Sequence, residues 1–134
     1  MSWAEAKWIV DTVTQKTGQP PNNMQKLTAS LNSDKTTISL YFLEPDDSVD
    51  KDGNTICTVG GVMIRVSDTG YPKSLTDGEL VIDNTDLGQY NETPFVFKNV
   101  TKGKTYYFRA FPYSKVKVYN QSSNASNRAQ VEVK

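Results

Sequence analysis

Residues 99–113 read Asn-Val-Thr-Lys-Gly-Lys-Thr-Tyr-Tyr-Phe-Arg-Ala-Phe-Pro-Tyr, and this stretch decides the fold. A turn at Lys102 and Gly103 precedes a run in which the side chains alternate between two faces of a strand. One face carries Tyr106, Phe108 and Ala110, and the other carries Tyr107, Arg109 and Phe111. A tyrosine placed just after such a turn is typical of the tyrosine corner of a β-sandwich. We therefore expect the Tyr106 hydroxyl to hydrogen-bond to the backbone near the turn.

The same period of two continues along the chain from about residue 25. Candidate strands lie at 27–31, 37–43, 55–66, 79–83, 93–100, 104–111, 115–119 and 128–134, of which 79–83 is a short apolar run. Gly60 and Gly61 are expected to form a bulge or bend in the third of these segments. About seven short strands separated by turn residues predict an all-β sandwich. We expect its core to contain Ile38, Leu40, Phe42, Val62, Ile64, Val66, Phe95, Phe97, Tyr106, Phe108, Ala110, Val131 and Val133.

The N-terminal residues 1–24 follow a different pattern, that of a short amphipathic helix and a Pro-rich linker. Ser2 and Glu5 have the spacing of a capping box, and Pro20 and Pro21 prevent the helix from continuing past Gly18. An apolar stripe about 120° wide contains Trp3, Ala6, Ile9, Val10 and Val13. The chain is therefore expected to divide into residues 1–24 and a sandwich of residues 25–134.

Trp8 lies outside the apolar stripe, on the polar side of the expected helix. Either it packs against a loop of the same chain or it contacts a partner. A sandwich of this size buries its own core, so an added apolar stripe suits docking onto a partner. The expected interface on this segment consists of Trp3, Trp8, Ile9 and Val13.

Two spacings in residues 25–134 resemble the fibronectin type III family. That family carries a core aromatic residue, usually tryptophan, three residues before a proline, and Phe42 and Pro45 match this spacing with a change of residue type. The family also places an apolar residue, a glycine and a tyrosine at intervals of three, as Val100, Gly103 and Tyr106 do here. The resemblance implies an immunoglobulin-like sandwich in which these residues are structural.

A narrower resemblance concerns the whole chain. The N-terminal helix, the Gln-Pro-Pro-Asn-Asn linker at 19–23 and the Tyr-Tyr-Phe-Arg-Ala-Phe-Pro-Tyr run are similar to virion proteins of phages that infect Gram-positive bacteria. This resemblance implies a virion location on the tail, the baseplate or the capsid surface. It also implies partners that are other virion proteins or copies of the same chain.

Composition disfavours several other classes of function. Fifteen basic residues balance fifteen acidic ones, so the chain has no excess charge to attract nucleic acid or an anionic membrane. Histidine is absent, which removes the commonest general base and the commonest metal ligand. The single cysteine, Cys57, lies in an apolar run and is expected to be a buried hydrophobic residue. We therefore expect no enzymatic activity and no cofactor.

An acidic loop at residues 46–54 is the one candidate metal site. Asp50 and Asp52 alternate ahead of Gly53, as the ligands of a calcium loop do. Position 59, where an EF-hand register would need a bidentate acid, is Val59. A solvated turn between strands is therefore the favoured interpretation.

Several aromatic residues could contact a ligand or a partner. Phe111 and Tyr113 flank Pro112, where the strand must bend, and they either face outward to an interface or pair with neighbouring strands. The function expected from the sequence is a structural module of a phage particle, attached through its N-terminal helix. The alternative is an adhesion module that binds a receptor or a host cell-surface glycan through loop aromatics such as Tyr71, Tyr90 and Tyr113.

Overall fold

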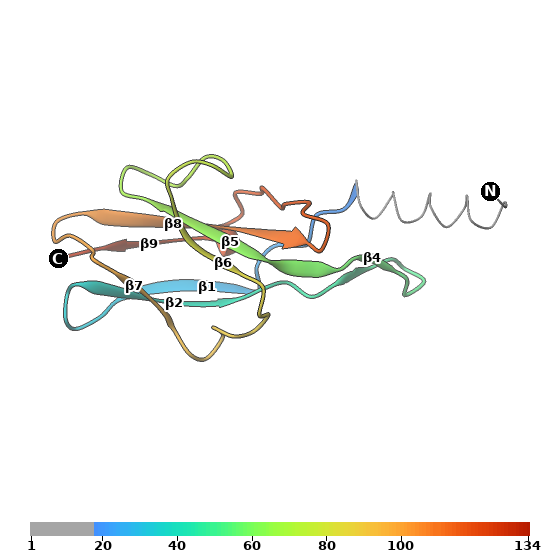
Figure 1. Cartoon of the computed structure of the whole chain (residues 1–134), viewed down its shortest axis with the longest axis horizontal. Helices are drawn as coiled ribbons and strands as arrows, with labels where there is room; N and C mark the ends of the chain where they lie inside the picture. The colour runs from blue at the N-terminus through green and yellow to red at the C-terminus, as the bar shows by residue number, and fades with distance from the viewer. Residues whose placement is uncertain (1–17) are drawn as a thin grey trace.

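The computed structural model describes residues 18–134, which form two β-sheets packed face to face (Figure 1). One sheet has the order β1-β2-β7, with bounds Lys26–Leu31, Thr37–Leu43 and Phe95–Lys98. The other has the order β6-β5-β8-β9, with bounds Glu79–Asn84, Val59–Ser67, Thr105–Ser114 and Arg128–Glu132. The expected all-β sandwich is confirmed. The helix expected before Gly18 lies outside the described residues.

Polar turn residues set the local geometry of the strands. In the turn between β1 and β2, the Asp34 carboxylate accepts hydrogen bonds from the backbone amides of Thr36 and Thr37, at 2.9 and 3.0 Å. The register of β5 against β8 shifts between Val59 and Gly61. This shift is the bulge expected from the two adjacent glycines at 60 and 61.

The core lies between the two sheets and agrees with the expected set of residues. Ten of the thirteen expected residues are buried in it, and Phe95, Phe97 and Tyr106 are partly buried and pack against it. Met24, Leu27 and Val100 are buried in the same cluster, although they were not in the expected set. The burial of Met24 means that the packing of the sandwich begins before residue 25.

Two segments differ from the expected strands. Residues 115–119 form a tight return, because Lys117 has a left-handed φ of 65° and its amide donates to the Ser114 carbonyl at 2.9 Å. The return is not a regular strand, since its β-pairing is limited to one isolated bridge between Tyr113 and Tyr119. The acidic loop contains the short strand β3 (Ser48–Val49), which pairs with β4 (Thr55–Cys57) in a separate hairpin.

Candidate functional site

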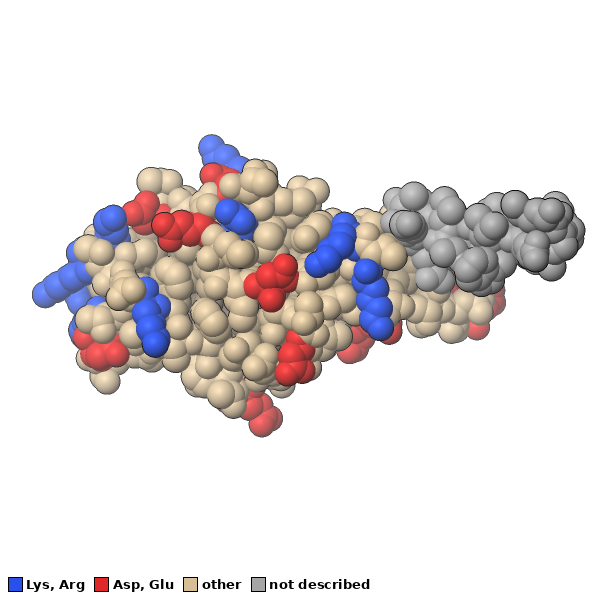
Figure 2. Space-filling view, in the orientation of Figure 1, with Lys and Arg blue, Asp and Glu red and all other residues tan. Residues whose placement is uncertain are grey.

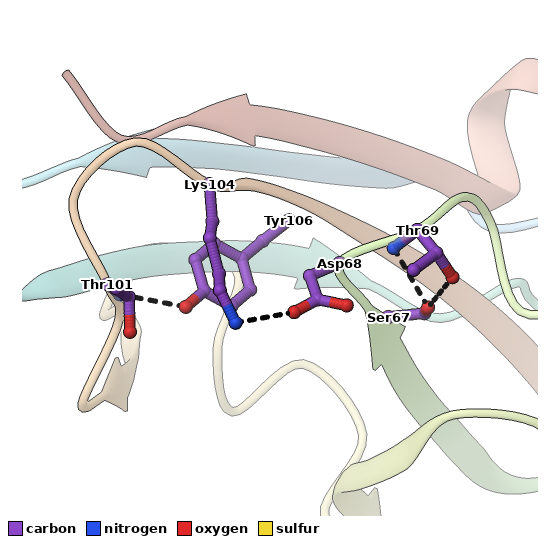
Figure 3. Close-up of polar contacts among 6 residues, drawn as sticks. All are labelled: Ser67, Asp68, Thr69, Thr101, Lys104 and Tyr106. Carbon is purple, nitrogen blue, oxygen red and sulfur yellow. Dashed lines mark hydrogen bonds and ion pairs between the residues drawn. The ribbon is translucent and has the colours of Figure 1, made fainter.

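The tyrosine corner has the geometry that the sequence predicts. The backbone amide of Thr101 donates to the Tyr106 hydroxyl oxygen at 2.8 Å (Figure 3). Gly103 has a φ of +93°, which glycine adopts without strain, and its amide donates to the Val133 carbonyl at 2.7 Å. The turn is thus tied both to β8 and to the C-terminal end of the chain.

Tyr106→Phe is expected to lower the free energy of unfolding by roughly 1 kcal/mol, because the Thr101 amide loses its partner at a solvent-exposed position. Chemical denaturation followed by circular dichroism measures the change. Tyr107→Phe is the matched control, since Tyr107 contacts Tyr71 through its ring at a centroid distance of 5.2 Å. Equal stabilities of the two variants would contradict the assignment of the corner.

A cavity of about 520 Å³ lies beside this corner, between the two sheets. It opens where β5 ends, β6 begins, β7 ends and β8 begins, so all four strands contribute to its wall. Its lining consists of Val66, Ser67, Asp68, Gly78, Glu79, Phe97, Lys98, Asn99, Thr101, Lys104 and Tyr106. The volume falls within the range of small-molecule sites.

An ion pair lies on the rim of the cavity. The Lys104 ammonium donates to Asp68 Oδ2 at 2.9 Å, and the two side chains remain 50% and 39% exposed (Figure 3). The hydrogen bond and the positive charge of Lys104 lower the pKa of Asp68, and Asp68 in turn raises the pKa of Lys104. Both groups are therefore charged at neutral pH. Beside them the Ser67 and Thr69 hydroxyls lie 3.0 Å apart.

Phe111 and Tyr113 do not form an exposed interface, contrary to one of the two sequence interpretations. Their side chains are 0% and 1% exposed, and they form a second cluster with Met63, Leu75 and Tyr119. Both residues lie on the face of β8 that points away from the main core, as the alternation predicts. Loops of the same chain cover this face. Arg109 holds two of them in place, because its guanidinium donates to the carbonyls of Pro72 and Gln121, at 2.9 and 2.5 Å.

The Tyr113 hydroxyl is also satisfied inside the chain. It donates to the Asp83 carboxylate, and its ring packs against Tyr119 at a centroid distance of 5.1 Å. Burial, together with the hydrogen bond to Asp83, raises the pKa of the Tyr113 phenol. The Lys117 ammonium lies over the Tyr113 ring, 4.0 Å from its centroid, so the chain itself encloses this side chain.

The other two aromatics of the adhesion interpretation are separated and partly buried. Tyr90 packs against Phe42 and Phe95, at centroid distances of 5.3 and 5.6 Å. The Tyr71 ring packs against Tyr107, and its hydroxyl bonds to Gln130 at 3.1 Å. Neither tyrosine lines the cavity, so the structure does not bring Tyr71, Tyr90 and Tyr113 together in one site.

The acidic loop uses its carboxylate internally. Asp50 Oδ1 accepts from the backbone amides of Asp52 and Asn54, both at 2.9 Å, and these bonds lower the pKa of Asp50. Within residues 18–134, no cluster of three or more His, Cys, Asp or Glu side chains is placed to hold a metal ion. Asp50 therefore serves as the cap of the turn between β3 and β4.

Phe42 and Pro45 are both buried, in the structural role that the sequence assigns to them. Between them in sequence, Glu44 is only 2% exposed, and no motif indicated its burial. Its carboxylate accepts from the Asn84 side-chain amide at 2.8 Å and from the Gly88 backbone amide at 3.0 Å. These bonds fix the segment after β6 against the end of β2.

Three asparagines form an anchor for the linker that precedes β1, and no motif in the sequence indicated it. Asn127 Oδ1 accepts from the Met24 amide at 2.8 Å, and Asn127 Nδ2 donates to Asn23 Oδ1 at 2.9 Å. Asn120 Nδ2 donates to the same Asn23 oxygen and to the Pro21 carbonyl, both at 3.0 Å. We call Asn23, Asn120 and Asn127 the asparagine anchor. Trp3, Trp8, Ile9 and Val13 lie outside the described residues.

The solved structures that are similar to the chain include two with fibronectin type III-like domains. One, titled "Structure of FN3tt mut", has a TM-score of 0.49 and 12% identity, covering 86% of this chain and 98% of that one. The other, a crystal structure of domains A168-A170 from titin, has a TM-score of 0.47 and 17% identity, covering 84% of this chain and 32% of that one. No protein-family model and no curated protein matches the chain. The fold class therefore rests on the strand order and the core of the chain itself.

In the described part of the chain, no helix has the length and apolar character needed to cross a membrane.

Proposed function

We propose that this chain is a non-enzymatic structural module that is attached to a larger assembly through its N-terminal segment. We propose that this assembly is the virion of a phage of Gram-positive bacteria, because the linker at residues 19–23 and the run at residues 106–113 resemble those of such virion proteins. Its partners are then other virion proteins or further copies of the chain. The sandwich is the rigid body that the module presents.

The observation that supports this proposal is the asparagine anchor. Pro21, Asn23 and Met24 are held by hydrogen bonds to residues about 100 positions later in the chain. Asn127 is fully buried and Met24 is 3% exposed, so water does not compete freely for these bonds. A segment that ends at this anchor joins the sandwich at a fixed point, which suits a module that holds a defined orientation on a partner.

The sequence of the N-terminal segment supplies the second argument. Residues 24–133 provide a main core of thirteen buried residues, ten of them from the set expected for the sandwich. Because the described residues already provide a core of their own, the apolar stripe with Trp3, Ile9 and Val13 and the separate Trp8 are proposed to make an intermolecular contact. Trp8, on the polar side of the expected helix, offers a second apolar contact beside the stripe.

Trp8→Ala in the full chain is expected to abolish self-association or assembly onto the partner while leaving the melting temperature of the sandwich unchanged. Gln15→Ala is the matched control, because Gln15 belongs to the same expected polar face but carries no large apolar surface. Light scattering of the full chain measures self-association, and co-sedimentation with virion particles measures attachment.

Removal of residues 1–17 extends the test. We expect a folded sandwich that keeps its cooperative thermal unfolding and its melting temperature, and no attachment. A truncated chain that no longer folds would mean that the N-terminal segment belongs to the core, and the attachment proposal would then be wrong. Unchanged attachment by both the truncated chain and Trp8→Ala would contradict it as well.

A further inference from the structure

We propose that the cavity between β5, β6, β7 and β8 binds a neutral saccharide, with a hexopyranose ring as the unit that it recognises. This binding is separate from the N-terminal attachment proposed above. It uses residues that the loop-aromatic interpretation did not include, since Tyr71, Tyr90 and Tyr113 lie elsewhere.

The cavity is accessible because of the strand order. β6 is the outer strand of one sheet and β7 is the outer strand of the other. The two sheets therefore end side by side at the cavity, and its wall is made of the beginning of β6 and the end of β7. A ligand can enter between these two edges without any strand having to separate from its neighbour.

Part of the cavity wall is aromatic. Phe97 and Tyr106 both line it, with ring centroids 6.0 Å apart and planes at 66°. Both are partly exposed, whereas the neighbouring Phe108, which packs edge-on against Phe97 at 5.4 Å, is fully buried. The exposed ring surface can pack against the C–H groups on one face of a sugar ring.

The rim supplies the hydrogen bonds that sugar hydroxyls require. In the Lys104–Asp68 pair, an ammonium donor and a carboxylate acceptor lie 2.9 Å apart and remain about half exposed (Figure 3). Two neighbouring hydroxyls can bind to this pair, one accepting from Lys104 and the other donating to Asp68. Because each charged group already holds the other in place, little side-chain freedom is lost on binding.

The charge of the lining selects a neutral ligand. The two negative charges of Asp68 and Glu79 balance the two positive charges of Lys98 and Lys104 in the lining. Acidic and basic side chains both occur on the face shown in Figure 2. A small apolar ligand would displace water from the Lys104–Asp68 pair without offering it hydrogen bonds, and an anionic ligand would encounter Asp68 and Glu79. A ring with one apolar face and several hydroxyls satisfies both parts of the wall.

The test is an NMR titration of the full, isotopically labelled chain with separate millimolar solutions of glucose, galactose, mannose, N-acetylglucosamine, maltose, cellobiose and glucuronate. We expect saturable shifts of backbone amides at residues 66–68, 78–79, 97–99 and 101–106 with at least one of the neutral sugars. Saturable shifts with glucuronate alone, shifts centred on other residues, or no saturable shift with any sugar would overturn the proposal.

Two exposed substitutions show whether the rim takes part. Asp68→Asn and Lys104→Gln should each weaken binding of the sugar that gives the shifts by about tenfold, because each removes one charged hydrogen-bonding partner. Asp52→Asn, a matched change in the distant β3–β4 turn, should leave the affinity unchanged. Equal affinities for all three variants would overturn the assignment. Loss of Trp8 is expected to leave sugar binding intact, which separates this proposal from the attachment proposal.

Discussion

Phe111→Ala should lower the free energy of unfolding by about 3–5 kcal/mol, as expected when a fully buried phenylalanine is truncated. Phe111 is 0% exposed and packs with Met63 and Tyr113 on the outer face of its sheet. The Arg109 guanidinium lies over its ring at 4.6 Å and also binds the covering loops through the carbonyls of Pro72 and Gln121. Removing the ring leaves a cavity beneath a charged group that cannot move in to fill it.

Guanidinium denaturation followed by far-ultraviolet circular dichroism measures this loss. Val116→Ala is the control, because Val116 is an apolar residue of the return after β8 that remains 43% exposed. Its change should stay within about 0.5 kcal/mol. If Phe111→Ala lowered the free energy of unfolding no more than Val116→Ala does, Phe111 would behave as an exposed residue. That outcome would favour the interpretation in which Phe111 faces outward to an interface.

The features that were predictable from the sequence depend on neighbours in the chain. The alternation in residues 104–111 placed Phe108 and Ala110 in the core, because the pleat of a strand alone decides which face each residue takes. The tyrosine corner joins Thr101 to Tyr106, five positions away. The bulge at Gly60 and Gly61 follows from the two glycines themselves. In each case the decisive interaction is local.

The features that were missed depend on contacts between distant segments. The alternation put Phe111 and Tyr113 on the correct face, but it could not show that the loops around Pro72 and Gln121 cover that face. The rim of the cavity joins Asp68 to Lys104 across 36 positions. The asparagine anchor joins Asn23 to Asn127 across 104 positions, and asparagine in a loop ordinarily predicts only a turn.

Gly61→Ala is expected to lower the free energy of unfolding by about 3 kcal/mol, at the upper end of the range for overpacking. A Cβ at position 61 would lie 2.7 Å from the Tyr113 hydroxyl oxygen and 2.9 Å from Tyr113 Cζ, and it would overlap the backbone carbonyl oxygen of Asn84. Neither neighbour can withdraw easily. Tyr113 is held by its hydrogen bond to Asp83 and by packing against Tyr119, and the Asn84 carbonyl belongs to the paired strand β6.

The same denaturation measurement, applied to three further variants, separates this cause from a general effect of replacing glycine. Gly18→Ala is the matched control, since a Cβ there has no neighbour within 4 Å, and its stability should change by less than about 0.5 kcal/mol. In a Tyr113→Leu background the alanine at position 61 meets only the Asn84 carbonyl, so the added cost of Gly61→Ala should fall by about 1 kcal/mol or more. An additive double variant would show that the ring of Tyr113 does not exclude a side chain at position 61. The cost of Gly61→Ala would then come from the Asn84 carbonyl and the bulge in β5.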